Sequence, residues 1–405
     1  MSAPDTRALQ EAIDAKARAG GGTVRIAAGR YVTGALTLRD DITLELEAGA
    51  VLLGSEDPAD YPPIEARWEG RHQTTHAPLI GGTGLRNVAV TGRGTIDGRG
   101  AVWWERHRAK TLEYPRPRLI SIAESTNVLV EGLTLVNSPA WTVNPVRCDN
   151  VTVRGLTIVN PPDSPNTDGI NPDSCRYVHI SDCHLDVGDD CITIKSGIET
   201  EAPDKRGPCE AITITNCTMI HGHGGVVLGS EMSGDIRSVV ISNCVFTQTE
   251  CGIRIKTRRG RGGVIEDVRA SNIVMREVLL PFTVNLFYNA YRKGDPVVMD
   301  KRPRPVDAGT PRVRRIRFGE ITAEDAQYAA AFIYGLPEMP IEDVSFRDVS
   351  IAMSPNARAG VPRNFDDLAP LSRAGFIARN VRGLQLDGVR VTGQAGDEFV
   401  LEGVT

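Results

Sequence analysis

The sequence is poor in aromatic residues, in metal-binding motifs and in long apolar runs. Aromatic residues make up only 5% of its 405 residues, so the core must be filled mainly by aliphatic side chains. The eight cysteines include no Cys-x-x-Cys pair and no Cys/His spacing typical of a zinc site. No apolar run reaches the length of a transmembrane helix, and a net charge of −5 gives no reason to expect nucleic acid as a partner.

The chain also lacks a recognisable signal peptide and an internal linker. Its N-terminus, MSAPDTRALQEAID, is a polar helix start. As written, the sequence therefore predicts a cytoplasmic protein, or a secreted or periplasmic one if a signal peptide has been removed. We expect one domain over residues 1–405, long enough to bury a sizeable core. The sequence is silent on the oligomeric state.

One short amphipathic helix, within residues 5–18, precedes a repeat of short strands. Leu9 and Ile13 lie four residues apart in this helix, and a run of three glycines ends it. The strands share a pattern of alternating apolar residues, as in NVLVEGLTL, NVTVRGLTI, YVHISDCHL, AITITNCTM and SVVISNCVF. The equivalent positions are 23 to 34 residues apart and are Leu133, Leu156, Cys183, Cys217, Cys244 and Ile273.

A repeat of this length, made of strands and turns, is typical of a solenoid. Each coil buries its apolar face only by stacking on its neighbours. A propeller is the competing architecture, but its blades need about 40 residues or more, and most steps here are shorter. We predict an all-β, single-stranded right-handed parallel β-helix of about ten coils, with residues 1–22 as a capping helix. Cys183, Cys217 and Cys244 are then small buried hydrophobic residues; a disulfide is sterically conceivable but not demanded.

The longest break in the repeat lies between Leu279 and Arg312. A long insertion in a solenoid is usually a loop on one face, often the binding face. We therefore predict an inserted loop over residues 279–312. Its aromatic residues could stack on a ligand or simply pack the loop against the coils, and the second is at least as well supported; they are Phe282, Phe287, Tyr288 and Tyr291.

A second strand in each coil brings polar residues into register. Aligning DGINPDS, DCITIKS, GGVVLGS and CGIRIKT places Ile170, Ile192, Val226 and Ile253 in one inward column. Alternation then sends two further columns outward: Asn171, Thr193, Val227 and Arg254, followed by Asp173, Lys195, Gly229 and Lys256.

The same register predicts a polar cluster just before this strand. Asp168 should stack beside Asp190, and Asp189 beside His223, at the ordinary strand spacing of about 4.8 Å. Neighbouring residues in a regular strand face opposite sides, so Asp189 and Asp190 can share one patch only if a turn or bulge re-aims one of them. Gly188 favours such a turn. The alternative is that one aspartate binds its own backbone as an Asx turn.

A run of basic residues follows at Arg254, Lys256, Arg258, Arg259 and Arg261. Taken alone, a charge run is best interpreted as a solvated loop. Combined with the aspartates, the run could supply the local positive patch with which an acidic protein binds an acidic polymer.

Crowded carboxylates suit the hydrolysis of glycosidic bonds. One carboxyl group must stay protonated to donate a proton to the leaving oxygen, and another must be ionised to activate water or attack the sugar. Like charges packed together raise one pKa, which supplies the acid form. We expect a mildly acidic optimum.

Four ordered segments resemble glycoside hydrolase family 28, the polygalacturonases. They are Asn166-Thr167-Asp168, Gly188-Asp189-Asp190, Gly222-His223-Gly224 and Arg254-Ile255-Lys256. Each alone is weak, but the ordered set is specific, and the similarity extends from the first helix to GLPEMPIEDVSF near residue 346. The resemblance implies inverting hydrolysis of α-1,4 galacturonosyl linkages in pectin or pectic oligosaccharides, without a metal or organic cofactor.

The resemblance also implies a role for each residue. Asp189 is the expected general acid, and Asp168 and Asp190 are expected to hold and deprotonate the attacking water. His223 would tune and position the acid. The expected substrate-binding residues are Asn166, Arg254 and Lys256, the two cations binding a galacturonate carboxylate beside the scissile bond.

Two departures from the family pattern matter. Family members usually begin with a strand before the first helix, which this chain lacks, so its true N-terminus stays open. The stretch ETEAPDKRGP from Glu199 lengthens one coil, and a loop that closes one end of a groove favours exo action.

Two alternatives stay open. A pectate lyase on the same architecture would hold calcium on the aspartates and use Arg254 as a base. A non-catalytic carbohydrate-binding β-helix would keep the basic and aromatic groups, because fold does not dictate function. The sequence does not separate homogalacturonan from other pectic polymers.

Overall fold

The chain folds as a right-handed parallel β-helix, and its computed structural model describes residues 3–290 and 292–405. Two compact units share these residues: 3–192 with 210–213, and 193–209 with the rest from 214 onward. Within the described ranges, no helix is long and apolar enough to cross a membrane.

The first unit contains two helices, a short 3-10 helix and a succession of short strands. The helical elements are α1 (Thr6–Arg18), η1 (Pro58–Asp60) and α2 (Ala101–Arg108). The strands are β1 (Gly22–Ile26), β2 (Gly29–Thr33), β3 (Leu36–Thr37), β4 (Ile42–Leu46), β5 (Ala50–Gly54), β6 (Pro63–Trp68), β7 (Arg71–His76), β8 (Ile80–Thr83), β9 (Arg86–Gly92), β10 (Thr95–Asp97), β11 (Ile120–Ala123), β12 (Thr126–Glu131), β13 (Thr134–Val136), β14 (Val143–Val146), β15 (Asp149–Arg154), β16 (Thr157–Val159), β17 (Arg176–Ser181) and β18 (His184–Val187).

The second unit has longer strands. The division falls within β19 (Ile192–Ile194) and β20 (Cys209–Thr215). The remaining elements are η2 (Pro203–Lys205), β21 (Thr218–His221), β22 (Val226–Gly229), β23 (Ile236–Thr247), β24 (Cys251–Lys256), β25 (Val264–Arg276), β26 (Leu280–Asn285), β27 (Arg312–Ala326), β28 (Ala329–Tyr334), β29 (Ile341–Met353), β30 (Ala374–Asp387), β31 (Arg390–Thr392) and β32 (Phe399–Val404).

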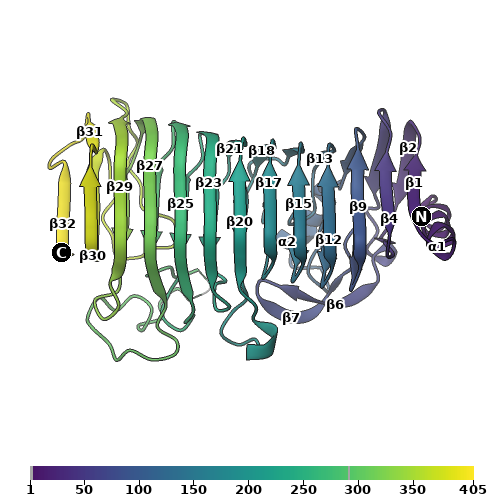
Figure 1. The fold of residues 1–405 in the computed structure, drawn as a ribbon, viewed down its shortest axis with the longest axis horizontal. Helices are drawn as coiled ribbons and strands as arrows, with labels where there is room; N and C mark the ends of the chain where they lie inside the picture. The colour runs from purple at the N-terminus through teal and green to yellow at the C-terminus, as the bar shows by residue number, and fades with distance from the viewer. Residues whose placement is uncertain (1–2, 291) are drawn as a thin grey trace. The chain divides into compact units, whose positions relative to one another are not determined.

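Parallel pairing between successive coils forms three sheets in the first unit. One sheet contains β1, β4, β9, β12, β15 and β17, which lie side by side in Figure 1. A second contains β2, β5, β10, β13, β16 and β18. The third contains β3, β8, β11 and β14, and bridges from Val143 to Ile170 and from Ile170 to Ile192 extend it. The predicted register of this third sheet is thereby confirmed, and it is the sheet that carries the aspartates.

Asparagines in the left-handed conformation lie near the start of β9, β12 and β15. Asn87, Asn127 and Asn150 occupy equivalent positions with φ of 53°, 58° and 58°. Asn127 donates its side-chain N–H to Asn87 at 2.8 Å, and Asn150 donates to Asn127 at 2.7 Å. Asparagine tolerates this conformation better than most residues, and its amide bonds link each coil to the next.

Parallel pairing also organises the second unit. Its sheets contain β23, β25, β27, β29 and β30, and β22, β24, β26 and β28. Gly229 pairs with Lys256 and Val227 with Arg254, as the aligned columns predict. In the core, Phe282 packs against Phe318 and Phe346 with ring centroids 5.0 and 5.1 Å away.

The cysteine prediction is confirmed. All eight cysteines are buried, and each is a free thiol. Cys244 pairs with Ile273 on the next coil, the equivalence that the repeat indicates. These cysteines therefore serve as small apolar core residues.

The predicted inserted loop begins later than expected. Residues 280–285 form β26, and the described irregular residues are 286–290 and 292–311. All six residues of β26 are buried, because its outward side is covered as well as its inward side. The sequence of β26 therefore lacks the alternation of apolar and polar residues that marks the other strands. Phe282 and Phe287 are fully buried and cannot stack on a ligand, and Tyr291 lies outside the described residues.

Candidate active site

Asp168 and Asp190 lie on neighbouring coils of the first unit, as the register predicts. The backbone N–H of Gly169 donates to the carbonyl oxygen of Asp190 at 3.1 Å. Asp168 is 3% exposed and Asp190 is 1% exposed. The side chain of Asn171 donates to the Asp168 carboxylate at 2.7 Å, which holds it in one orientation.

Asp189 occupies the bend between β18 and β19, where the turn prediction is confirmed. Its carboxylate accepts a hydrogen bond from the backbone N–H of the next residue, Asp190, at 2.9 Å, whereas an Asx turn would reach two residues on. A Cβ at Gly188 would lie 2.5 Å from the carbonyl oxygen of Pro161 and 2.6 Å from that of Ser164. Only glycine fits this position, and it lets the chain bend directly before the aspartate pair.

Arg116 anchors the loop that carries Asn166, and sequence reasoning missed it. Its guanidinium donates to the carbonyl oxygens of Pro139 at 2.9 Å and Pro165 at 2.6 Å. A further N–H donates to the side-chain oxygen of Asn166 at 2.6 Å. The side-chain oxygen of Asn166 is thus engaged by the protein itself, and this residue is locked beside Asp168.

Arg116 also provides positive charge near the carboxylates. Burial lowers its pKa to about 10, while the charges of Glu69, Asp168 and Asp189 act in the opposite direction. The side chain is 1% exposed and stays protonated at neutral pH. No repeat or motif distinguishes Arg116 in the sequence, because it lies in an irregular segment between α2 and β11.

A second anchor holds the backbone of the Asn-Thr-Asp segment. Asn160 is 1% exposed and accepts a hydrogen bond from the backbone N–H of Ser138 at 2.8 Å. Its side-chain N–H groups donate to Thr142 at 3.0 Å and to the carbonyl oxygen of Thr167 at 3.2 Å. Satisfied buried polar networks of this kind fix a unique geometry.

The hairpin of β6 and β7 packs over the aspartate-bearing sheet of the first unit. Arg67 donates to Asp173 at 2.6 Å, and both side chains are almost fully buried. Trp68 stacks on Trp141 with ring centroids 5.1 Å apart and planes 10° apart. Asp173, one of the outward residues of the alignment, is therefore bound by a hairpin that the alignment could not reveal.

In the second unit, Arg254 and Lys256 lie on β24 and share one aromatic neighbour. Arg254 is 2% exposed and Lys256 is 7% exposed. The Arg254 guanidinium carbon and the Lys256 Nζ each lie 5.5 Å from the ring centroid of Tyr288. Arg254 also donates to the carbonyl oxygen of Arg363 at 3.1 Å. His223 lies half-buried in the turn between β21 and β22.

Glu231 is a buried carboxylate near these cations that sequence reasoning missed. Its Oε2 accepts from Lys195 Nζ at 3.1 Å. Burial acts to raise its pKa, but the charges of Lys195, Arg261 and Lys256 outweigh burial and lower it to about 2. Glu231 therefore stays ionised at neutral pH and balances the cations around it.

The prediction of a solvated basic loop at Arg258, Arg259 and Arg261 is wrong. These side chains are 5%, 6% and 7% exposed because each pairs with a buried or half-buried acid. Arg258 and Arg261 both bind Glu199, the first residue of the lengthened coil. Burial acts to raise the pKa of Glu199, but the two arginines lower it to about 2.

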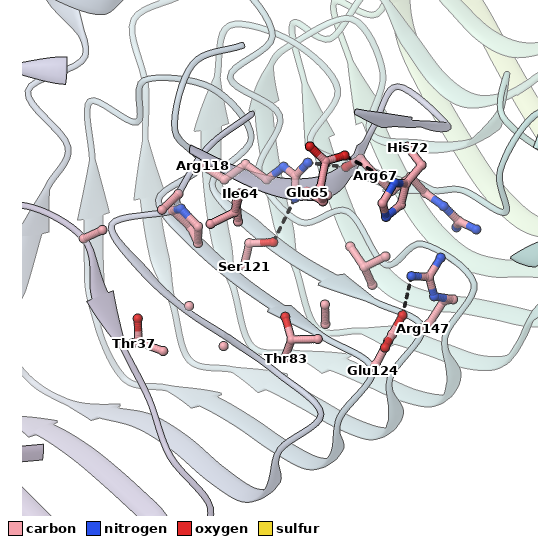
Figure 2. A pocket seen from close by; sticks show the side chains of 18 of the residues that line it. Thr37, Ile64, Glu65, Arg67, His72, Thr83, Arg118, Ser121, Glu124 and Arg147 are labelled. Carbon is pink, nitrogen blue, oxygen red and sulfur yellow. Dashed lines mark hydrogen bonds and ion pairs between the residues drawn. The ribbon is translucent and has the colours of Figure 1, made fainter. Parts of the chain in front are cut away.

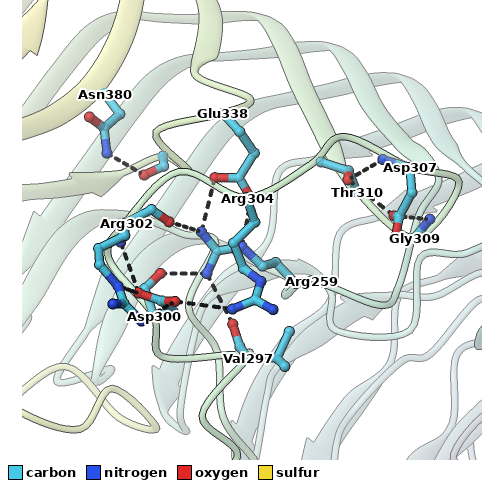
Figure 3. A network of polar contacts seen from close by, with 11 residues as sticks. Arg259, Val297, Asp300, Arg302, Arg304, Asp307, Gly309, Thr310, Glu338 and Asn380 are labelled. Atoms are coloured by element: carbon cyan, nitrogen blue, oxygen red, sulfur yellow. Dashed lines mark hydrogen bonds and ion pairs between the residues drawn. The ribbon is translucent and has the colours of Figure 1, made fainter.

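Arg259 instead organises the inserted segment (Figure 3). It binds Glu338 through two hydrogen bonds of 2.6 and 2.9 Å. It also donates to the carbonyl oxygens of Val297 at 3.0 Å and Asp300 at 2.5 Å. These arginines are structural, which leaves Arg254 and Lys256 as the substrate-binding candidates of the run.

The arrangement suits acid–base chemistry on a sugar. The first unit holds two buried carboxylates on adjacent coils with a third directly beside them. Carboxylate oxygens are also the ligands that calcium prefers, and Asp189 and Asp190 are residues of this unit that could hold such an ion. The second unit supplies two cations against one aromatic ring, a combination that binds carboxylates.

Known proteins share both the sequence and the fold. The family model described as glycosyl hydrolases family 28 matches residues 30–362. A probable polygalacturonase of Vitis vinifera is 35% identical over 378 residues, which is 91% of this chain and 75% of that protein. An endo-polygalacturonase of Pectobacterium carotovorum is 29% identical over 66% of this chain and 69% of that protein.

Solved structures agree with this similarity. A hyperthermoactive exopolygalacturonase from Thermotoga maritima superimposes with a TM-score of 0.79 at 27% identity, covering 97% of this chain and 89% of that one. A family 28 exopolygalacturonase from Yersinia enterocolitica has a TM-score of 0.80 at 22% identity, covering 99% and 74%, and supports the fold alone. The family match, the sequence identity and the fold together show that this chain belongs to glycosyl hydrolases family 28 and is a glycoside hydrolase.

Proposed function

We propose that this protein is a polygalacturonase that hydrolyses α-1,4 galacturonosyl linkages in pectin or pectic oligosaccharides, with inversion and from a chain end. The observation that carries this proposal is the cluster of three carboxylates in the first unit. Asp168 and Asp190 lie on adjacent coils, and Asp189 lies in the bend beside them. The named relatives, which are polygalacturonases, support the substrate class.

The roles follow from the chemistry of inverting hydrolysis, which needs one acid and one base on opposite sides of the sugar. Asp189, the least buried of the three, donates the proton to the leaving oxygen. Asp168 and Asp190 hold and deprotonate the attacking water, and His223 positions the acid. The positive charge of Arg116 acts on Asp168, and a nearby cation stabilises the ionised form of a carboxylate.

The proposed substrate-binding residues are Arg254, Lys256 and Asn166. Arg254 and Lys256 bind a galacturonate carboxylate, because paired cations form strong charge-assisted hydrogen bonds with such a group. The Tyr288 ring, held through its hydroxyl by Asn364 at 3.1 Å, supports both cations. Asn166 contacts the sugar through the part of its amide that Arg116 leaves available.

The β6–β7 hairpin supports action at a chain end. Trp141 lies one coil before Asp168 in the same register, since the N–H of Thr142 donates to the Asp168 carbonyl oxygen at 2.9 Å. Trp68 covers Trp141, and Arg67 is fixed to Asp173. A polymer therefore meets a wall on this side of the aspartates and cannot run on across the coils of the first unit.

Digestion of a panel of pectic substrates tests this function. The panel comprises polygalacturonate, xylogalacturonan, a rhamnogalacturonan backbone and short galacturonate oligomers, with products sized from the first minutes. We expect monogalacturonate alone as the early product of polygalacturonate. A ladder of oligomers from the start would contradict chain-end action. An ultraviolet-absorbing unsaturated product that disappears with a chelator would indicate a lyase, and no turnover on any substrate would indicate a binding module.

A further inference from the structure

The β6–β7 hairpin encloses a cavity that the reaction described above does not use. The cavity has a volume of about 500 Å³ and lies between the hairpin and strands β8 and β11 of the first unit (Figure 2). Its size falls within the range of small-molecule sites, about 300–1,000 Å³. Its polar and charged lining residues are Thr37, Glu65, Arg67, His72, Thr83, Arg118, Ser121, Glu124 and Arg147.

Arg118 is a buried cation that lacks a carboxylate partner. It is 5% exposed, and no carboxylate among residues 3–290 and 292–405 forms an ion pair with it. Its guanidinium donates to Ser121 Oγ at 3.1 Å and to the carbonyl oxygen of Arg67. The Nε atom is buried without an acceptor among the residues that the structure describes.

Arg118 stays charged although it is buried and forms no ion pair with a described carboxylate. Its guanidinium carbon lies 5.3 and 5.5 Å from the ring centroids of Trp68 and Trp141. The carboxylate of Asp173 is already bound by Arg67 at 2.6 Å. Burial lowers the pKa of Arg118 to about 10 while the nearby charge of Asp173 acts to raise it, so Arg118 stays protonated at neutral pH. Burying a charge without an ion-pair partner costs free energy. An anion bound to Arg118 would therefore stabilise the folded protein.

The rest of the cavity suits a polyhydroxylated ligand. Hydroxyl groups of Thr37, Thr83 and Ser121 line it, and such groups both donate and accept hydrogen bonds. At its edge, Arg147 and Glu124 form an ion pair at 2.5 Å (Figure 2). A compact ligand with one carboxylate and several hydroxyls matches this combination of one unpaired cation and several hydroxyls.

The cavity is separate from the aspartates. Arg118, Trp141 and Asp168 occupy one register column on three successive coils, as the pairing of Ile120 with Val143 shows. Arg118 and Asp168 are two coil steps apart, which corresponds to about 10 Å. Trp141, stacked on Trp68, lies in the coil between them.

We propose that this cavity binds a uronic acid, with the sugar carboxylate on Arg118. The choice of a sugar acid rests on the proposed function, whereas the anion site follows from the cavity alone. The ligand comes either as the free monosaccharide or as the end residue of a pectic chain, which share the same carboxylate and hydroxyl groups.

Calorimetric titration of the full-length Asp189→Asn variant tests the proposal, because this variant cannot convert an oligomer during the measurement. Galacturonate is expected to bind at least tenfold more tightly than galactose, its neutral counterpart. Arg118→Gln should weaken galacturonate binding at least tenfold. Ala123→Phe should do the same by filling the cavity while leaving Arg118 in place, which separates loss of the site from misfolding.

Two control variants locate the binding event. Arg154→Gln, which removes an exposed arginine on β15, and Lys256→Met, which alters the cations of the second unit, should both retain Arg118-dependent binding. A trigalacturonate that depends on Arg118 when the monomer does not would identify the chain end as the ligand. Equal binding of galacturonate and galactose, or acid binding unaffected by both cavity variants, would overturn the proposal.

Hydrolysis of polygalacturonate by the parent protein is measured in parallel. Hydrolysis without Arg118-dependent binding overturns the cavity proposal alone. Binding without hydrolysis overturns the proposed function and leaves the anion site standing.

Discussion

Replacing Asp189 with asparagine is expected to lower kcat on polygalacturonate by about 10²- to 10⁴-fold, the range that a general acid contributes. An amide cannot donate the proton that the leaving oxygen needs. The fold should survive, because the amide oxygen of asparagine can still accept the hydrogen bond that Asp190 N–H gives to Asp189 at 2.9 Å. Steady-state kinetics of the parent and the variant test the expected loss of kcat. Their melting temperatures test whether the fold is retained.

Asp163→Asn is the matched control for Asp189→Asn. Asp163 lies in the loop just before the Asn-Thr-Asp segment, and its side chain is 83% exposed. Its loss should leave kcat within about twofold of the parent. If Asp189→Asn retained more than a tenth of the parent kcat with an unchanged pH profile, Asp189 would not be the acid.

Replacing Glu231 with glutamine is expected to destabilise the protein by about 3–5 kcal/mol at pH 7, as removal of one partner from a buried ion pair does. Lys195 would lose its carboxylate partner at 3.1 Å while remaining buried. The cations Lys256 and Arg261, which also stabilise the Glu231 carboxylate, would lose their balancing charge. Because Lys256 is a proposed substrate-binding residue, KM should rise as well.

The destabilisation should shrink as the pH falls. The pKa of Glu231 is lowered from its ordinary 4.5 to about 2 in the folded protein, so its contribution is fully present above pH 4.5 and is lost as the pH falls towards 2. The free energy of unfolding of parent and variant, measured in urea at pH 7, 4 and 3, gives the comparison. Glu320→Gln, an exposed change in the same unit, should have little effect at any pH. A Glu231→Gln difference that is the same at all three values would contradict the charge argument.

The fold and the motif positions were accessible from sequence because the solenoid is a local, repeating structure. The strand period predicts which residues pair, and Gly229 with Lys256 and Cys244 with Ile273 do pair. The same register brought Asp168 and Asp190 onto adjacent coils. Gly188 predicted the bend beside Asp189, and the steric contacts of its backbone explain why no other residue fits.

The side-chain contacts between irregular segments and the strands of the coils could not be predicted from the sequence. Arg116 holds Asn166 across a separation of 50 residues, and Arg67 holds Asp173 across 106. Neither residue belongs to the repeat, so no periodicity marks it. The buried state of Arg258, Arg259 and Arg261 was missed for the same reason, because the acids that pair with them, Glu199 and Glu338, lie in irregular segments.

The central claim is that the three aspartates of the first unit perform a single displacement on a galacturonosyl linkage. Proton NMR of the first products from polygalacturonate or a short oligomer tests this claim most directly. The account predicts that the newly formed reducing end appears first as the β-anomer and then equilibrates to the mixture. Initial release of the α-anomer would contradict the inverting mechanism and the roles given to Asp168, Asp189 and Asp190.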